Sequence, residues 1–227
     1  MLYNEESVRA NLRNRDGKRV FFLGRGDQLT SGARDFLNRE RIDIRSGEQA
    51  KIEEYRLLNG GFLREKPEHM THLRGDILVE KTHPVITFRG KMDTLQSALL
   101  LCQAENPDKK QALGEILELA RSILGQEVLE RPVQAVKLCE LTEDEVRRRS
   151  HFPQEYYGQP HFVPSAADGR GLLLLNFARC MAREAELAAA GAFTNAEGNV
   201  TRGDIVRALN RMSSMLYLLM IEKKSQG

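Results

Sequence analysis

The sequence has no long apolar run, no strong excess of either charge and few cysteines. Residues 1–20 contain no apolar h-region, and no uninterrupted apolar run reaches the roughly 18–20 residues that span a bilayer. The 34 basic and 32 acidic residues give a net charge of +2, and no extended basic tract favours nucleic acid. The short basic cluster Arg147–Arg149 is expected to face solvent. We therefore expect a soluble, cytoplasmic protein with neither a membrane nor a nucleic-acid partner.

The cysteine content also limits the kind of site that the chain can carry. Cys102, Cys139 and Cys180 lie apart in predicted helices and form no C-x-x-C pair, so we expect reduced, buried thiols. His69 and His72 would meet on one helical turn, but two imidazoles without a third ligand are weak evidence for a metal. We expect no transition metal bound by the protein.

At 227 residues the chain can form one large core and a small appendage. A strand at 18–23, a helix from Thr30 or Ser31 to Arg39 and a strand at 42–44 predict a β-α-β appendage over residues 1–45. Residues 46–66 are charged, contain Gly60 and Gly61 and lack clear periodicity, which indicates a linker. The glycine-rich turn at 24–27 is suited either to hold a phosphate on its backbone amides or to dock a partner or another subunit.

Residues 67–224 are expected to form a helical bundle. Residues 76–83 are expected to form a turn before Pro84, and residues 152–168, rich in proline and aromatic residues, a lid or plug. Capping boxes at Thr142–Glu145 and Thr201–Asp204 mark the starts of two helices. Apolar periodicity predicts helices at 93–104, 107–121 with an extension to 130, 146–150, 171–191 and 205–221. The sequence thus predicts a mainly α protein with a ferritin-like, up-down bundle of about five helices.

The two most apolar helices, 171–191 and 205–221, carry their polar residues in short local bands. Arg179, Arg183 and Glu186 project from one side of the first helix, because they lie four and three residues apart, and Asn176 continues this stripe. Buried charges are costly unless they are paired, so the arginines form either an internal salt-bridge network or a binding site for a phosphate chain. In the second helix the polar residues lie in the first half, namely Asn210, Arg211, Ser213 and Ser214.

Two motifs in these helices resemble the paired signature of the helical-bundle corrinoid adenosyltransferases. They are Arg179-x-x-x-Arg183-Glu184-x-Glu186 and Leu209-Asn210-Arg211-Met212-Ser213, and their form is similar to that of the ethanolamine-utilisation branch. Further segments that resemble this branch are Pro67–Leu73, Phe88–Asp93 and Ser150–Gly169. The resemblance covers roughly residues 67–221 in order.

The resemblance implies an enzyme, an ATP:corrinoid adenosyltransferase. It would transfer the 5′-deoxyadenosyl group of ATP to the cobalt of reduced cobalamin and release triphosphate, with Mg²⁺ accompanying ATP. By carry-over, Arg183 binds the phosphate chain, Asn210 binds the ribose or the α-phosphate, and Glu186 orients Arg183. Arg211 belongs to the same nucleotide site.

The resemblance also implies that a loop side chain displaces the lower axial ligand of the corrinoid. His161 and Phe162 are both candidates for this role, and Phe88 is a third corrinoid-binding residue. Ser214 stands where the wider superfamily has Asp, which leaves the role of that carboxylate open. Members of the branch often carry an upstream H-x11-C-C-x-x-C metal cluster, but residues 55–68 contain no cysteine. This departure removes the metal ligands.

The superfamily builds its active sites between subunits, so we expect a homo-oligomer, either a trimer or a dimer, in which Arg179 bridges to Asp93 of another subunit. The implied partners are an electron-donating flavoprotein reductase and either ethanolamine ammonia-lyase or the shell of a bacterial microcompartment enclosing the protein. Two alternatives stay open. One is a corrinoid or nucleotide carrier without catalysis, and the other is a scaffold bundle in which Arg179 and Arg183 form core ion pairs.

Overall fold

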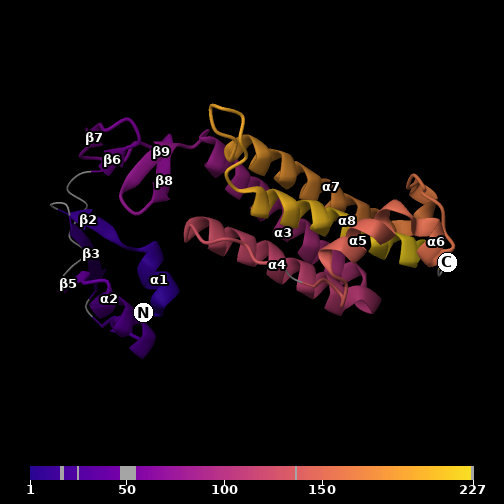
Figure 1. Ribbon diagram of the computed structural model, residues 1–227, viewed down its shortest axis with the longest axis horizontal. Coiled ribbons are helices and arrows are strands. Elements are labelled where there is room, and N and C mark those ends of the chain that lie inside the picture. The colour runs from indigo at the N-terminus through magenta and orange to yellow at the C-terminus, as the bar shows by residue number, and fades with distance from the viewer. Residues whose placement is uncertain (16–17, 25, 47–54, 136, 226–227) are drawn as a thin grey trace. The chain divides into compact units, whose positions relative to one another are not determined.

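The computed structural model describes residues 1–15, 18–24, 26–46, 55–135 and 137–225. The chain divides into two compact units, Met1–His83 and Pro84–Gly227, each of which is described by itself (Figure 1). The first unit holds all the named strands, and the second holds the long helices. The structure confirms a mainly α protein with a helical bundle and a small N-terminal strand region.

The first part of the N-terminal unit contains the predicted β-α-β arrangement. Strand β3 (Lys18–Leu23) leads into helix α2 (Ser31–Arg39) and then into β5 (Asp43–Ser46), which pairs with β3 in parallel. Thr30 caps α2, because its side chain accepts a hydrogen bond from the Ala33 amide. The remaining elements are β1 (Leu2–Tyr3), α1 (Glu5–Ala10), β2 (Arg13–Arg15) and β4 (Gln28–Leu29). Their shared apolar core consists of Val8, Phe21, Ala33, Phe36, Leu37 and Ile42.

The second part of this unit is a four-stranded sheet that the sequence did not predict. Its strands are β6 (Tyr55–Leu57), β7 (Phe62–Leu63), β8 (Met70–Arg74) and β9 (Ile77–Glu80), in the order β7-β6-β9-β8. The expected linker at 46–66 is therefore wrong for the strands within it, while residues 47–54 lie outside the described residues. The expected turn at 76–83 is wrong for β9.

An ion pair between Arg56 and Asp76 joins strand β6 to the residue before β9. Arg56 Nε and Nη2 donate to the two carboxylate oxygens of Asp76, at 3.0 and 2.9 Å, and Asp76 is buried. A bulge between His72 and Arg74 interrupts the alternation that would have marked β8. His72 lies on this strand, so it shares no helical turn with His69. Burial lowers the pKa of the His72 imidazole.

The second unit is a bundle of four long helices with shorter ones at its side (Figure 1). The long helices are α3 (Pro84–Glu105), α4 (Lys110–Val128), α7 (Gly169–Ala192) and α8 (Gly203–Ser225). The shorter helices α5 (Glu143–His151) and α6 (Pro153–Tyr157) pack on α8. Two 3₁₀ turns, Pro107–Lys109 and Ala166–Asp168, precede α4 and α7. The predicted helices are confirmed, and so is the capping box that begins α5 at Thr142.

Helix α7 lies between α3 and α8, against which it makes its most extensive contacts. One face of α7 is lined by alanines, which are buried and spaced by four, three and four residues, so the neighbouring helices approach closely. These residues are Ala178, Ala182, Ala185 and Ala189. Helix α8 is buried nearly all round in its second half, as its composition predicted.

The predicted capping box at Thr201–Asp204 is wrong. The Thr201 hydroxyl donates to the carbonyl of Phe193, and Asp204 accepts from the Val133 amide at 2.8 Å and from Arg202 at 3.0 and 2.9 Å. Neither side chain thus forms the reciprocal pair of hydrogen bonds that defines a capping box, and α8 begins at Gly203.

Ion pairs between the helices complete the bundle. Arg89 of α3 binds Glu127 of α4, and Lys109 binds Glu222 of α8 at 2.7 Å. The three cysteines are free, and burial raises the pKa of Cys102 to about 11. In the described part of the chain, no helix is both long and apolar enough to cross a membrane.

Candidate functional site

Glu186 of α7 and Asn210 and Arg211 of α8 form one hydrogen-bonded network. The Asn210 side-chain amide donates to a Glu186 carboxylate oxygen at 2.9 Å, and Arg211 Nη1 donates to the Asn210 Oδ1 at 2.6 Å. We call Arg179, Arg183, Glu186, Asn210 and Arg211 the polar band. Glu186 was expected to orient Arg183, but in this structure its hydrogen bond fixes the Asn210 amide instead. The network orients one carboxamide and one guanidinium group along the α7–α8 contact.

Two of the three arginines of α7, Arg179 and Arg183, have no acidic partner among the residues that the structure describes. Arg183 is exposed and makes no hydrogen bond or ion pair with any residue that the structure describes, whereas the neighbouring Glu184 pairs with Lys91 at 2.7 Å. Arg179 is half-buried, and its guanidinium carbon lies 5.7 Å from the centroid of the Tyr217 ring. A cation against an aromatic face is stabilised without being neutralised. The core ion pairs of the scaffold alternative are thus absent from the described residues of this chain.

The loop that precedes α7 brings His161 and Phe162 to the same tyrosine. The His161 ring stacks on Tyr217 with centroids 5.7 Å apart and planes 10° apart, and Phe162 lies 6.1 Å from Tyr217 at 25°. Arg179 contacts this ring as well. Tyr217 therefore connects the predicted corrinoid-binding loop to Arg179 of the polar band. We call His161, Phe162, Tyr217 and Arg179 the aromatic cluster.

The hydrogen bonds of His161 define its tautomer. Nε2 lies 3.2 Å from the carbonyl oxygen of His151, which can only accept, so this nitrogen carries the proton. Nδ1 lies 2.9 Å from the Tyr217 hydroxyl oxygen and, in this tautomer, accepts a hydrogen bond from the hydroxyl group. Tyr217 thus holds the imidazole in one orientation at the exposed end of the cluster.

Phe88 lies in the core and Asp93 on the surface of α3. Phe88 is fully buried, and its ring packs edge-on against Phe193 with centroids 5.4 Å apart, so it serves the core of α3. Asp93 is exposed on the same helix and makes no ion pair with Arg179 within the described part of this chain. The Asp93–Arg179 bridge between subunits stays a prediction, as does a corrinoid contact for Phe88.

Tyr217 was not predicted as a residue of the site. A signal was present, since Asn210, Ser214 and Tyr217 follow one another by four and three residues and lie on one face of α8. Tyr217 was instead assigned to the apolar run because its ring suits a helical core. Its hydroxyl and its ring face serve two different partners.

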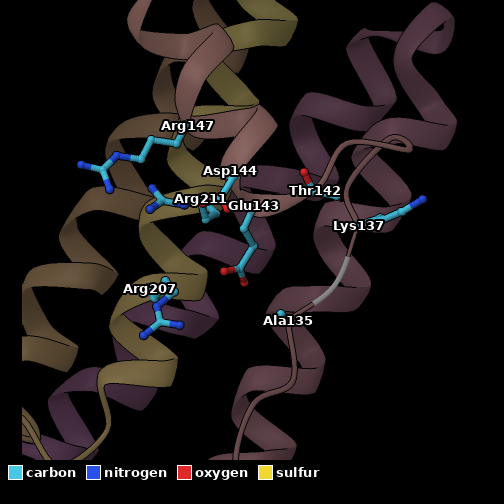
Figure 2. Close-up of a pocket in the computed structure, with 8 residues that line it drawn as sticks. All are labelled: Ala135, Lys137, Thr142, Glu143, Asp144, Arg147, Arg207 and Arg211. Atoms are coloured by element: carbon cyan, nitrogen blue, oxygen red, sulfur yellow. The ribbon is translucent and has the colours of Figure 1, made fainter.

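A basic cavity between α5 and α8 was not predicted from the sequence. It has a volume of about 510 Å³, and it is lined by Arg147, which is exposed as expected, together with Arg207 and Arg211 (Figure 2). The other residues that line the cavity are Ala135, Lys137, Thr142, Glu143 and Asp144. Because Arg211 also donates to Asn210, the cavity borders the polar band.

The described residues contain no group of side chains that would hold a metal ion, and the Gly24 amide of the glycine-rich turn is not available to a phosphate. No three or more His, Cys, Asp or Glu side chains gather there in an arrangement that holds a metal ion. In the turn at 24–27 the Gly24 amide already donates to Asp27 at 3.0 Å, so it is not available to a phosphate in this conformation. Arg25 lies outside the described residues.

Comparisons with known proteins agree with the motifs of α7 and α8. Residues 62–222 match the family model described as cobalamin adenosyltransferase. The corrinoid adenosyltransferase EutT of Salmonella typhimurium is 37% identical over 157 residues, which cover 69% of this chain and 59% of that protein. Its namesake from Escherichia coli is 34% identical over the same coverage. The chain thus spans 59% of the length of these curated relatives.

Proposed function

Because the chain belongs to the cobalamin adenosyltransferase family, we propose that it transfers the 5′-deoxyadenosyl group of ATP to the cobalt of reduced cobalamin. In this reaction the electron pair of cob(I)alamin attacks C5′, the C5′–O bond breaks, and its electrons leave on the oxygen of triphosphate. The cobalt is a strong nucleophile and needs no general base. The protein must instead align the reactants and stabilise the charge of the leaving group.

The observation that carries this proposal is the unneutralised Arg183 beside the hydrogen-bonded Glu186–Asn210–Arg211 network. A planar guanidinium group binds phosphate oxygens through paired donors and keeps its charge at neutral pH. We assign Arg183 to the phosphate chain and Asn210 to the ribose or the α-phosphate. Glu186 positions the Asn210 amide, and Mg²⁺ accompanies ATP as its counterion.

The aromatic cluster is assigned to the corrinoid. Its two loop side chains, His161 and Phe162, are held against Tyr217 in the second half of α8. A ring in this position would cover the lower face of cobalt and favour the four-coordinate state, which is easier to reduce. Arg179 connects this cluster to the nucleotide site by its contact with the Tyr217 ring. Arg179, Arg183 and Asn210 are thus the proposed catalytic residues.

The partners and the cellular role follow from the same resemblance. We propose a flavoprotein reductase as electron donor, a homo-oligomer as the active form, and a role in ethanolamine utilisation. There the product would supply ethanolamine ammonia-lyase, in the cytoplasm or inside a microcompartment. The relatives that support this branch are EutT corrinoid adenosyltransferases.

The direct test is an adenosylation assay with the full chain. Purified protein is incubated with MgATP and chemically reduced cobalamin, and the cobalt–carbon product is followed by its absorbance while triphosphate is measured separately. We expect equal amounts of adenosylcobalamin and triphosphate. Tight binding of both substrates without product would instead favour the carrier alternative, and a failure to bind either one would favour the scaffold alternative.

A further inference from the structure

The basic cavity between α5 and α8 is not explained by the roles assigned above. Arg207 and Arg211 lie four residues apart on α8 and therefore on one face, and Arg147 reaches the same cavity from α5, which packs on α8. Like charges at this spacing destabilise a helix. In Figure 2 Arg147, Arg207 and Arg211 lie on one side of the view, and Ala135 and Lys137 lie on the other.

These arginines have not been neutralised by the protein. Neither Arg147 nor Arg207 makes a hydrogen bond or ion pair through its guanidinium group with any residue that the structure describes. Arg211 donates only to the neutral Asn210, and its Nε is buried without a hydrogen-bond partner. A buried donor without a partner is costly, so the cluster has capacity for an anion.

The size and charge of the cavity limit the ligand. Its volume of about 510 Å³ lies in the range of small-molecule sites and exceeds the needs of a single phosphate. Glu143 and Asp144 also line the cavity, and their carboxylates would repel a bare polyanion. Magnesium is commonly held by one or two carboxylates together with phosphate oxygens, so it would turn this repulsion into attraction.

We propose that the cavity lined by Arg147, Arg207 and Arg211 is a second anion site, which binds a polyphosphate chain as its magnesium complex. The identity of the polyphosphate rests on the proposed function, since triphosphate is the group that adenosyl transfer leaves behind. Arg211 borders both the cavity and the nucleotide network through its hydrogen bond to Asn210. The departing triphosphate can therefore be received next to the place where it forms.

The test is a calorimetric titration of the full chain with inorganic triphosphate, with and without magnesium chloride. A charge-assisted contact contributes enough that Arg147→Ala and Arg207→Ala should each weaken binding about tenfold. Both side chains are exposed, so the variants should fold, which a thermal melt checks. Arg148→Ala is the matched control, because Arg148 is adjacent on α5 but lies over the Tyr156 ring, 5.4 Å from its centroid. It should change the affinity less than about twofold.

Three results would overturn the proposal. They are no binding of triphosphate in either buffer, equal effects of all three substitutions, and loss of binding in Arg183→Ala with normal binding in Arg207→Ala. The titration needs no turnover, so it is independent of the adenosylation assay. A chain that binds triphosphate through Arg207 but makes no adenosylcobalamin would keep this site and reject the proposed function. An active chain whose affinity is unchanged in Arg147→Ala and Arg207→Ala would do the reverse.

Discussion

Arg89 in α3 and Arg183 in α7 have the same chemistry and different surroundings. Arg89 donates to both carboxylate oxygens of Glu127, at 2.8 and 3.3 Å, and the Glu127 side chain is 0% exposed. Arg183 is exposed and meets no acid among the described residues. The first arginine is paired inside the protein, and the second has no partner among the described residues, which is why we propose that it binds a ligand. Whether an arginine pairs with an acid inside the protein is therefore a better guide to its role in folding or in binding than its position in a motif.

The largest expected effect is on Arg183. Replacing it with alanine should lower kcat/KM for adenosylation about 10²- to 10³-fold, because a charge-assisted contact to the leaving group is lost. The melting temperature should stay unchanged, since the side chain has no partner in the part of the chain that the structure describes. Arg170→Ala is the matched control on the same helix, because Arg170 pairs with Glu105 at 3.5 Å and should not affect turnover. Wild-type kcat/KM in Arg183→Ala would remove Arg183 from the mechanism.

The paired arginine should show the opposite response. Glu127→Gln leaves Arg89 beside a neutral group in a buried position, so the free energy of unfolding should fall by about 3 kcal/mol in a urea titration. Activity per folded molecule should be retained. Glu118→Gln tests an exposed glutamate of the same helix, which pairs with Arg121, and should cost less than about 0.5 kcal/mol. Equal losses in the two variants would contradict the contrast between α3 and α7.

A change at Tyr217 should have an intermediate effect, because its ring and its hydroxyl group contact different residues and one contact can be removed while the other is kept. Tyr217→Phe keeps the ring under Arg179 but removes the hydrogen bond to His161 Nδ1. We expect kcat to fall about tenfold, which corresponds to one hydrogen bond, and the four-coordinate cob(II)alamin spectrum with ATP to weaken. Tyr156→Phe, which keeps the ring near Arg148, is the control and should leave the spectrum intact. An unchanged spectrum in Tyr217→Phe would show that the orientation of His161 is irrelevant.

The smallest expected effect is at the start of α5, near the basic cavity. Thr142 caps this helix by accepting from the Glu145 amide, so Thr142→Ala should cost about 1 kcal/mol of unfolding free energy. Thr94→Ala, inside α3, should cost nothing, because its hydroxyl only donates to the Gly90 carbonyl one turn back. A loss in Thr94→Ala as large as in Thr142→Ala would mean that the cap is not the cause.

The same cap gives the stability a defined pH dependence. Hydrogen bonds from the Thr142 amide and hydroxyl lower the pKa of Glu145 below its ordinary value of 4.5. A carboxyl group whose pKa is lower in the folded state stabilises the protein above its unfolded pKa and loses that contribution as the pH falls through the folded one. The difference between wild type and Thr142→Ala should therefore be constant near neutral pH and shrink below pH 4.5. If the difference in unfolding free energy were the same in acid, ionised Glu145 would not contribute to the cap.

The sequence predicted the elements whose signals are local. The β3-α2-β5 unit, the cap at Thr142 and the interior position of α7 depend on spacings within one or two turns. The sheet of β6 to β9 depends instead on pairing between short strands and on the Arg56–Asp76 bond, which spans 20 residues. The false capping box has the same cause, since Asp204 is used by the amide of Val133, 71 residues away.

The candidate site was predicted in its residue types and less well in its contacts. The band on α7 and α8 was identified because its charges interrupt apolar helices, and the roles of Arg183 and Asn210 in binding stay predictions. The partner of Glu186 could not be predicted, because the choice between Arg183 and Asn210 depends on how α7 and α8 pack. Phe88 and Arg89 shared a motif with Asp93, yet the first two are held by Phe193 and Glu127, on distant segments.

The alanine face of α7 has a consequence for how the enzyme can be altered. The methyl groups of this face set the distance of α7 from α3 and α8. One added methylene at Ala182 or Ala185 would therefore push the helices apart, and the side chains on the other face of α7 would move together with the helix. The spacing of the side chains in the proposed site can therefore be changed by substitutions in the core face of α7, away from the polar band.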